Sequence, residues 1–335
     1  MKITTVQPLY RRTYDAESLV KTHPAKIRHA NKTVLYEIAC PPECIHGGRI
    51  EVSRWAQMEF PIQVSAVNAT KLEPRADVFD YEAPAPGFTD WHLNFSNADL
   101  FCAYGAAAFA QDEIQVAEHP ALASLREALI AEHCSIQTIE RNNPTPILIR
   151  GVERRCAVST DEIYGRKFAR AKREEVANAI RRIQPPTQTN IIAMEAPVGG
   201  FGKYTLREIE LILTTAFTGF AAARNECPDT KTAVHTGFWG CGAYGGNRIL
   251  MALLQILAAR LAGIERLVFH AVNSVGESVF SEASKKLDKV IAPDGGGILS
   301  RSLPQKSEKD QPVRLNDVLQ RIEGLGFMWG EGDGN

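Results

Sequence analysis

The sequence has no uninterrupted apolar run long enough to span a bilayer, which argues against a membrane-spanning segment. Its first residues, MKITTVQPLYRRTYDAE, lack the apolar core of a secretory signal, so we expect a cytoplasmic protein. It also lacks an excess of charge of one sign. The formal net charge is −1, which argues against binding to nucleic acid or membranes driven by whole-chain charge.

Cysteine provides no clear disulfide or metal framework either. The seven cysteines are an odd number and lie scattered along the chain. Cys40 and Cys44 form a C-x3-C pair with His46 close by, a weak indication of a metal site because the motif has no second half. We therefore interpret the cysteines as free thiols in a reducing compartment, and we expect no metal and no cofactor.

What is present is the composition of a globular α/β protein. The 335 residues are 44% hydrophobic and 23% charged, which suits one large domain with extensions or two domains. Apolar runs predict strands at 33–40, 60–72, 91–96, 144–152, 189–197, 230–237 and 264–272. Helical periodicity predicts helices at 121–133, 164–183, 205–225, 247–263 and 313–327. The pattern weakens after about residue 275, and we expect an exposed loop at 292–312 and a frayed tail at 330–335.

The most unusual stretch is VHTGFWGCGAYGGN at residues 234–247, between a predicted strand and a predicted helix. Glycine at this density indicates a backbone that turns tightly or approaches a ligand closely. Amides of such a loop and the start of the following helix can bind a diphosphate; the alternative is a turn without a ligand. Gly240, Gly242 and Gly245 match G-x-G-x-x-G, but the absence of G-K-[ST] excludes a Walker A loop.

A second informative stretch is NFSNADLFCAYGAAAFAQDEIQ at residues 94–115, which places Gln111, Asp112 and Glu113 in succession. Taken alone, adjacent acids are typical of a solvated helix N-terminus, where carboxylates interact favourably with the helix dipole. The residues by themselves leave that interpretation and a catalytic one equally open.

Together the two stretches resemble the poly(ADP-ribose) glycohydrolase branch of the macrodomain superfamily. TGFWGCGAYGGN followed by LLQILAA is similar to that family's T-G-x-W-G-C-G-A-F-G-G-D loop and helix. NFSN followed by QDEI is similar to its D-F-A-N segment and catalytic Q-E-E motif. The resemblance covers roughly residues 90–275 and implies an α/β macrodomain-like mixed sheet with helices on both faces. We expect an N-terminal accessory region at 1–75, the macrodomain at 76–275 and a C-terminal extension at 276–335.

The resemblance also implies roles for individual residues. Glu113 falls on the family's acid/base glutamate and Asp112 on the glutamate before it, so both are candidate catalytic residues. Asn97 falls on the asparagine that helps to hold the ribose near the scissile bond. The other candidate substrate-binding residues are Gln111 and, in the glycine loop, Phe238, Gly240, Gly242, Ala243, Tyr244, Gly245, Gly246 and Asn247.

The sequence departs from the family pattern close to the acidic motif. The family has three successive glycines ahead of Q-E-E, which make room for the substrate, whereas Phe101, Cys102 and Ala103 stand here. We expect these side chains to narrow the cleft. Asp112 replaces a glutamate, and Asn94 replaces the aspartate of D-F-A-N.

The resemblance implies an ADP-ribosyl glycohydrolase that acts on poly(ADP-ribose) or on a mono-ADP-ribosylated protein side chain. Glycoside cleavage needs a proton for the leaving group and an activated water, and Glu113 can provide both in turn. The alternatives are a non-catalytic ADP-ribose-binding module and an unrelated nucleotide-binding α/β enzyme. The expected partner is ADP-ribose or an ADP-ribosylated protein.

Two further features have simpler interpretations beside the functional ones. The basic segment at 166–182 is most simply a solvated helix face, although it could contact a polyanion such as poly(ADP-ribose). Cys241, with His235 close in sequence, could form a nucleophilic pair, but a small side chain needed for close packing is the simpler interpretation.

Overall fold

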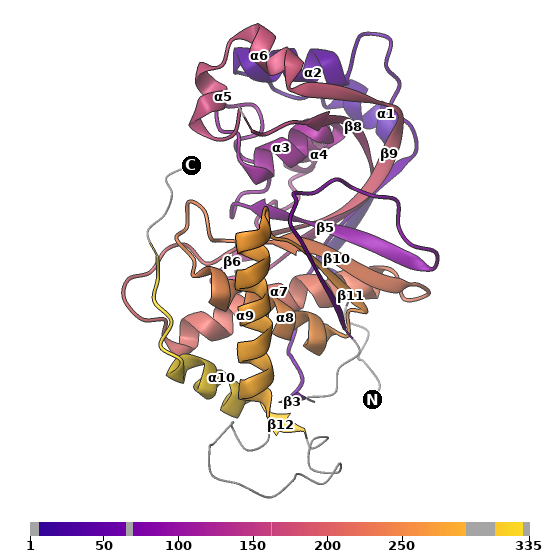
Figure 1. The fold of residues 1–335 in the computed structure, drawn as a ribbon. Coiled ribbons are helices and arrows are strands. Elements are labelled where there is room, and N and C mark those ends of the chain that lie inside the picture. Colours follow the sequence, from indigo (N-terminus) through magenta and orange to yellow (C-terminus); the bar gives the residue numbers. More distant parts are fainter. Residues whose placement is uncertain (1–6, 65–69, 162, 293–311, 331–335) are drawn as a thin grey trace, which may run out of the picture. The chain divides into compact units, whose positions relative to one another are not determined.

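The computed structural model describes residues 7–64, 70–161, 163–292 and 312–330. These residues form two compact units (Figure 1). Of the described residues, the first unit contains 7–56, 92–161 and 163–195, and the second contains 57–64, 70–91, 196–292 and 312–330. The division into 1–75, 76–275 and 276–335 that we expected from the sequence stays a prediction.

The first unit is built on a mixed sheet in the order β1-β2-β8-β9-β5. The antiparallel strands are β1 (Tyr10–Asp15), β2 (Arg49–Arg54), β8 (Ile147–Val158) and β9 (Ile180–Glu195). Strand β5 (Phe88–Ser96) pairs in parallel with β9 through residues 92–96. The short strands β6 (Ile139–Glu140) and β7 (Asn143–Pro144) form a separate hairpin.

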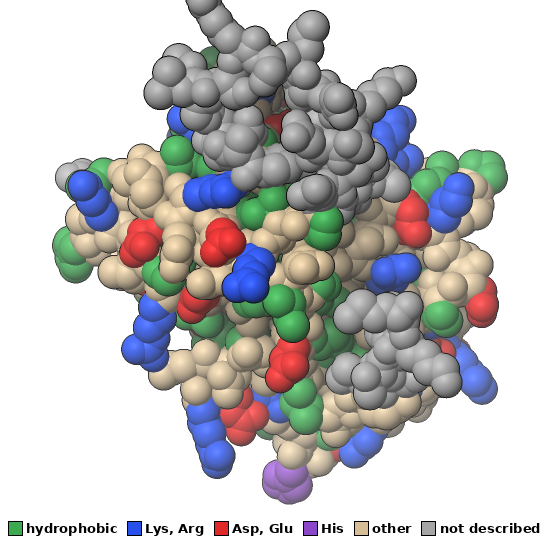
Figure 2. Space-filling model, turned by 90° about the horizontal axis from the view of Figure 1, so that it is seen from below, with side chains coloured by type: hydrophobic (Ala, Val, Ile, Leu, Met, Phe, Trp, Pro, Cys, Tyr) green, Lys and Arg blue, Asp and Glu red, His purple; other side chains and the backbone are tan. Residues whose placement is uncertain are grey.

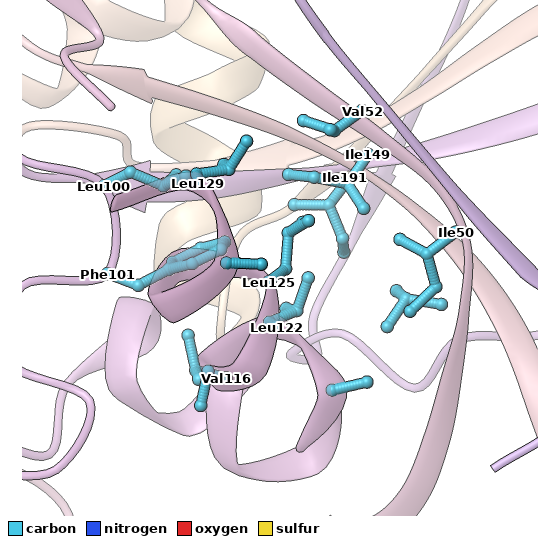
Figure 3. Close-up of a cluster of buried hydrophobic side chains, with 14 of the residues drawn as sticks. Ile50, Val52, Leu100, Phe101, Val116, Leu122, Leu125, Leu129, Ile149 and Ile191 are labelled. Carbon is cyan, nitrogen blue, oxygen red and sulfur yellow. The ribbon is translucent and has the colours of Figure 1, made fainter. Parts of the chain in front are cut away.

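Helices of the first unit pack onto this sheet and onto one another. They are α1 (Ala16–Thr22), α2 (Ala30–Ala39), α3 (Gln111–Glu118), α4 (Ala121–Ala131), α5 (Arg166–Arg170) and α6 (Arg173–Asn178). Figure 3 shows one core, in which Leu122, Leu125 and Leu129 of α4 face Ile149 of β8 and Ile191 of β9. A second core joins α2, α3 and α6 through buried residues that include Leu35, Phe109, Phe168 and Val176.

The second unit contains a parallel set of strands in the order β10-β11-β4, formed by β10 (Lys231–Gly237), β11 (Arg266–His270) and β4 (Lys71–Arg75). Strands β3 (Gln63–Val64) and β12 (Val313–Arg314) pair separately. The helices are α7 (Leu206–Glu226), α8 (Arg248–Ala262), α9 (Ser274–Ile291) and α10 (Leu315–Gly324). Helix α8 packs against α7 and α9, and α10 packs against α7 and α9. Mixed strands covered by helices confirm the predicted α/β class.

Local capping explains where the two long helices of this unit begin. Thr205 precedes α7, its hydroxyl accepts a hydrogen bond from the Glu208 amide, and the Glu208 carboxylate accepts from the Thr205 amide at 2.7 Å. This reciprocal arrangement is a capping box, which satisfies two amides at the start of the helix. Asn247 precedes α8, and its Oδ1 accepts from the amides of Ile249 and Leu250, both at 3.1 Å.

Three sequence-based predictions of secondary structure are wrong. Residues 33–40 were expected to form a strand, but residues 33–39 lie in helix α2 and Cys40 follows its last residue. Residues 164–183 were expected to form one helix but form α5, α6 and the start of β9, a strand that also contains Pro185 and Pro186. Helix α9 lies where the pattern weakened after residue 275. Most of the loop expected at 292–312, and all but the first residue of the expected tail, lie outside the described residues.

Charged side chains of both signs are interspersed over the uncovered part of the face shown in Figure 2, in keeping with the near-neutral net charge. Among the helices of the described residues, none is both long enough and apolar enough to cross a membrane.

Candidate active site

Helix α3 begins where the side chain of Gln111 is fixed to strand β5. Gln111 Oε1 accepts a hydrogen bond from the Phe95 amide at 2.7 Å, and Gln111 Nε2 donates to the Leu93 carbonyl at 3.0 Å. The amide side chain thus pairs with the strand backbone as a neighbouring strand would. This two-point attachment holds the first turn of α3 against the carboxyl end of β5, and Gln111 positions the two acids that follow it.

Asp112 and Glu113 are buried, each with 8% of its surface exposed. Asn94 of β5 donates to Asp112 Oδ1 at 3.0 Å. The Ala110 amide donates to Glu113 Oε2 at 2.9 Å, so the carboxylate folds back over the start of its own helix. The interpretation of these acids as a solvated helix N-terminus is therefore wrong, because both side chains are removed from water.

Burial perturbs the acidity of Asp112. The pKa of Asp112 is raised from 3.8 to about 7, mainly by burial and then by the neighbouring charge of Glu113, while the hydrogen bond from Asn94 and the charge of Lys32 act in the opposite direction. A carboxyl with such a pKa holds its proton for part of the time at neutral pH. This is the property required of a group that exchanges protons during catalysis near neutrality.

Lys32 is a charged residue of this site that sequence reasoning missed. It comes from α2, is fully buried, and its Nζ lies 4.9 Å from the centre of the Phe109 ring and 5.7 Å from that of Phe168. The two rings are stacked at 3.8 Å. Burial lowers the pKa of Lys32 to about 8, against the opposing effect of the carboxylates of Glu113 and Asp112. A lysine on the apolar face of a helical pattern was the available signal, and the assignment of the adjoining residues 33–40 as a strand obscured it.

The segment that replaces the family's three glycines has a different effect from the one expected. Phe101 has no exposed surface, and its ring lies in the core formed by α4 and the sheet (Figure 3). Its φ is +54°, in the left-handed region that favours glycine. The expectation that Phe101 narrows a cleft is therefore wrong, because the backbone has the conformation of a glycine while the side chain points into the core. Cys102 and Ala103 are partly exposed.

Asn97, the candidate ribose-binding residue, is exposed just after β5. Its Oδ1 accepts a hydrogen bond from the Asp99 amide at 3.2 Å. Asp99 in turn pairs with Arg126 through two contacts of 2.7 and 2.9 Å. Arg126 of α4 thus holds the turn that contains Asn97.

In the second unit, the glycine loop follows β10 and leads into α8. Gly240 and Gly245 have φ values of +74° and +66°, which favour glycine. A Cβ on Gly246 would lie 2.7 Å from the Gly240 carbonyl oxygen, and one on Gly240 would lie 2.6 Å from Ala196 Cβ. These three glycines are therefore required by the tight folding of the loop on itself.

Hydrogen bonds within the loop determine which of its backbone amides are available to bind an anion. The Gly245 amide donates to the Gly242 carbonyl at 3.0 Å, and the Gly246 amide to the Gly240 carbonyl at 2.9 Å. Within the described part of the chain, the amides of Gly242 and Ala243 donate to no backbone carbonyl. Ala243 is exposed and Tyr244 is partly exposed. The candidate anion-binding amides are thus those of the loop tip rather than those of Gly245 and Gly246.

The remaining predicted residues at this loop have structural partners. Asn247 uses its side chain to cap α8 and to contact the Met328 carbonyl at 3.2 Å. Phe238 packs edge-on against Phe269 at 5.1 Å, and the Arg248 guanidinium lies 5.0 Å from its ring centre. Arg248 is exposed at the first position of α8, where a cation opposes the helix dipole unless an anion is nearby. It was not recognised from the sequence.

A C-terminal segment, residues 327–330, holds the same loop. Trp329 stacks on Tyr204 at 4.1 Å, and the Tyr204 hydroxyl accepts from the Asn247 amide at 2.9 Å. The Gly330 amide donates to the Gly245 carbonyl at 2.9 Å. Two segments distant in sequence therefore fix the base of the loop, and no pattern in either segment indicated this.

The nucleophile pair considered from the sequence is not supported. Burial raises the pKa of Cys241 to about 12, and its thiol donates to the Trp239 carbonyl at 3.6 Å. The ring nitrogens of His235 lie 3.0 Å from Asp90 Oδ2 and 3.1 Å from His270 Nε2. The simpler interpretation of Cys241 as a packed side chain agrees with this geometry.

Comparison with known proteins agrees with the two motifs. The family model described as poly(ADP-ribose) glycohydrolase (PARG), macro domain fold, matches residues 91–277. Among solved structures, the chain is similar to PARG from Deinococcus radiodurans in complex with ADP-ribose, with 14% identity, 83% of this chain and 95% of the other covered, and a TM-score of 0.45. It is also similar to PARG from Thermomonospora curvata, with 15% identity, 82% and 85% covered, and a TM-score of 0.42.

The family model covers more than half of the chain and includes both the acidic segment and the glycine loop. The chain therefore belongs to the poly(ADP-ribose) glycohydrolase family with the macro domain fold, and it is a glycosidase-type hydrolase.

Proposed function

We propose that this protein hydrolyses the glycosidic bond of an ADP-ribosyl group, with Glu113 as the acid/base residue and Asp112 as its carboxyl partner. The supporting observation is the buried pair itself: two adjacent carboxyls share an environment that penalises a second negative charge. Asp112, whose pKa is raised to about 7, then holds a proton for part of the time near neutral pH.

The reaction needs two proton transfers, one from Glu113 to the leaving oxygen and one from water to Glu113. Glu113 donates its proton to the leaving oxygen as the bond from that oxygen to the anomeric carbon breaks. The resulting carboxylate then accepts a proton from water while the water oxygen bonds to the anomeric carbon. Glu113 is thereby returned to its starting state. The hydrogen bond from the Ala110 amide to Oε2 restricts the carboxyl and leaves Oε1 for proton transfer.

The glycine loop would bind the diphosphate. The amides at the tip of the loop and the cationic side chain of Arg248 supply donors and positive charge at the start of α8. Asn97 would contact the ribose, and Phe238 and Tyr244 would pack against the sugar or base. A polyanion contact through 166–182 stays a prediction; those residues span α5, α6 and the start of β9 rather than one helix face.

The test measures ADP-ribose released from poly(ADP-ribose) and, separately, from a mono-ADP-ribosylated protein. Glu113→Gln should lower kcat by roughly 10²–10⁴-fold, the usual contribution of a general acid/base. Binding of free ADP-ribose should be retained, because the substitution is nearly isosteric. Glu282→Gln, at an exposed position of α9, is the matched control and should retain full activity.

Full activity in Glu113→Gln would refute the proposed role of Glu113. ADP-ribose binding without release from either substrate, in the unmodified protein, would instead favour a binding module. Comparison of the two substrates decides between the polymeric and the mono-ADP-ribosylated substrate class.

A further inference from the structure

Three potential metal ligands meet in the segment that joins α2 to β2. Cys40 follows the last residue of α2, and its amide donates to the Tyr36 carbonyl at 2.8 Å. The Cys44 amide then donates to the Pro41 carbonyl at 2.9 Å, which closes a turn and directs the chain back towards Cys40. The two Sγ atoms and a ring nitrogen of His46 all lie within 4.8 Å of one another.

The distance between Cys40 Sγ and the His46 ring agrees with one edge of a tetrahedral zinc site. With zinc–sulfur bonds of about 2.3 Å and zinc–nitrogen bonds of about 2.0–2.1 Å, a sulfur and a nitrogen ligand are separated by about 3.6 Å. Cys40 Sγ and His46 Nε2 are 3.6 Å apart. The thiolates and the imidazole therefore do not need to move far to share one ion.

The other ring nitrogen of His46 is placed as in known zinc sites. His46 is buried, with 6% of its surface exposed, and its Nδ1 faces Glu153 Oε2 at 3.7 Å. Nδ1 has no hydrogen-bond partner among the described residues. A carboxylate behind the second nitrogen of a histidine ligand commonly fixes the orientation of the ring.

Glu153 is itself held firmly. Its Oε1 accepts from the Gly47 amide at 3.1 Å, and its Oε2 accepts from Arg155 Nε at 3.0 Å and Nη2 at 2.6 Å. Arg155 also donates to the Ile45 carbonyl. The loop that carries Cys44 and His46 is thus tied to β8, which preorganises the ligand positions.

We propose that Cys40, Cys44 and His46 bind one Zn²⁺ ion, with the fourth position taken by solvent. Thiolate and imidazole ligands select zinc over calcium or magnesium, which prefer oxygen. Both cysteines are partly exposed, which leaves a path for the ion and for a water ligand. This proposal replaces the interpretation of these two cysteines as free thiols.

The ion would have a structural role, because it would hold the loop that follows α2 in one conformation. This helix carries Lys32 and packs against α3, which begins with the acidic pair. Because metal binding orders the loop after α2, it would stabilise the helix that places the buried lysine. It would take no direct part in glycoside cleavage.

Metal content and cobalt spectroscopy test the site in the full-length protein, prepared reduced and free of chelators. We expect one zinc per chain. Replacing it with Co²⁺ should give the intense near-ultraviolet thiolate-to-metal absorption and the visible bands of a tetrahedral ion. Glu153→Gln should weaken zinc binding by about 10–100-fold, as other losses of a carboxylate behind a histidine ligand do. Cys40→Ser and His46→Ala should weaken it further.

Cys134→Ser is the control, because it removes a thiol of the same unit outside the cluster. A measurement on the unmodified protein avoids any folding defect of the variants: one equivalent of Zn²⁺ should protect two thiols from a thiol reagent. The proposal is overturned by no protection and no cobalt–thiolate absorption. It is equally overturned by a Cys40–Cys44 disulfide in freshly isolated protein, or by equal zinc affinity in Cys40→Ser and Cys134→Ser.

Discussion

Replacing Lys32 with methionine should stabilise the protein at neutral pH, and the gain should shrink as the pH rises. Lys32 is fully buried, and its Nζ makes no hydrogen bond within the described part of the chain. Methionine has a similar length and shape, so packing against Phe109 and Phe168 should be largely retained. The main change is removal of a buried positive charge.

The magnitude follows from the pKa. Burial lowers the pKa of Lys32 from 10.5 to about 8. Between these values the unfolded chain holds the proton and the folded chain does not, so the stability of the unmodified protein rises with pH in this interval. At about 1.4 kcal/mol for each unit of pKa, the rise amounts to roughly 3 kcal/mol. Below about pH 8 the folded protein carries the full free-energy cost of burying the Lys32 charge. The methionine variant should therefore be more stable there by up to roughly 3 kcal/mol.

Urea unfolding of both proteins between pH 7 and pH 10.5 measures the difference. We expect the stability advantage of Lys32→Met to fall by roughly 3 kcal/mol over this range. Lys21→Met is the control, because Lys21 is exposed and pairs with Glu17 on α1; its effect should stay within about 0.5 kcal/mol at every pH. A difference between Lys32→Met and the unmodified protein that does not vary with pH would refute the assignment of Lys32 as a buried charge.

Three further outcomes can be measured by urea unfolding. Asn247→Ala should cost about 1 kcal/mol, because α8 loses its cap, and an unchanged midpoint would contradict this role. Phe101→Ala should cost about 3–5 kcal/mol by emptying part of the core. Phe101→Gly should be more stable than Phe101→Ala by about 1 kcal/mol, because glycine tolerates the φ of +54°. The reverse order would contradict the argument that the backbone at residue 101 favours glycine.

Much of the secondary structure could be predicted because it depends on local sequence. Helix α7 combines helical periodicity with Thr205 and Glu208 at its start, and both signals lie within one short stretch. Strand β10 and helix α8 were predicted on either side of the glycine loop for the same reason. In such segments, the local preference and the tertiary environment agree.

The errors fall where distant contacts decide the conformation. Residues 33–40 are apolar with a β-branched start, a pattern that does not separate a short strand from a buried helix. They form a helix because Val34, Leu35 and Ala39 pack together in a core with α3 and α6. Strand β9 begins at Ile180 because it pairs with Val158 of β8, and Pro185 and Pro186 lie at a register shift that needs no ladder hydrogen bond from them.

The sequence alone determined that a glycine loop joins a strand to a helix, and that an acidic segment follows another strand at the spacing of a known family. Both are properties of consecutive residues. Tertiary structure alone decided that Lys32 lies beside the acids, that Phe101 turns into the core, and that Cys40, Cys44 and His46 converge in front of Glu153. The physical reason is that the burial of a side chain and the electrostatic effects on it depend on its neighbours in space rather than in sequence. The pKa of a carboxyl and the identity of its neighbours depend on residues that the chain brings together only when it folds.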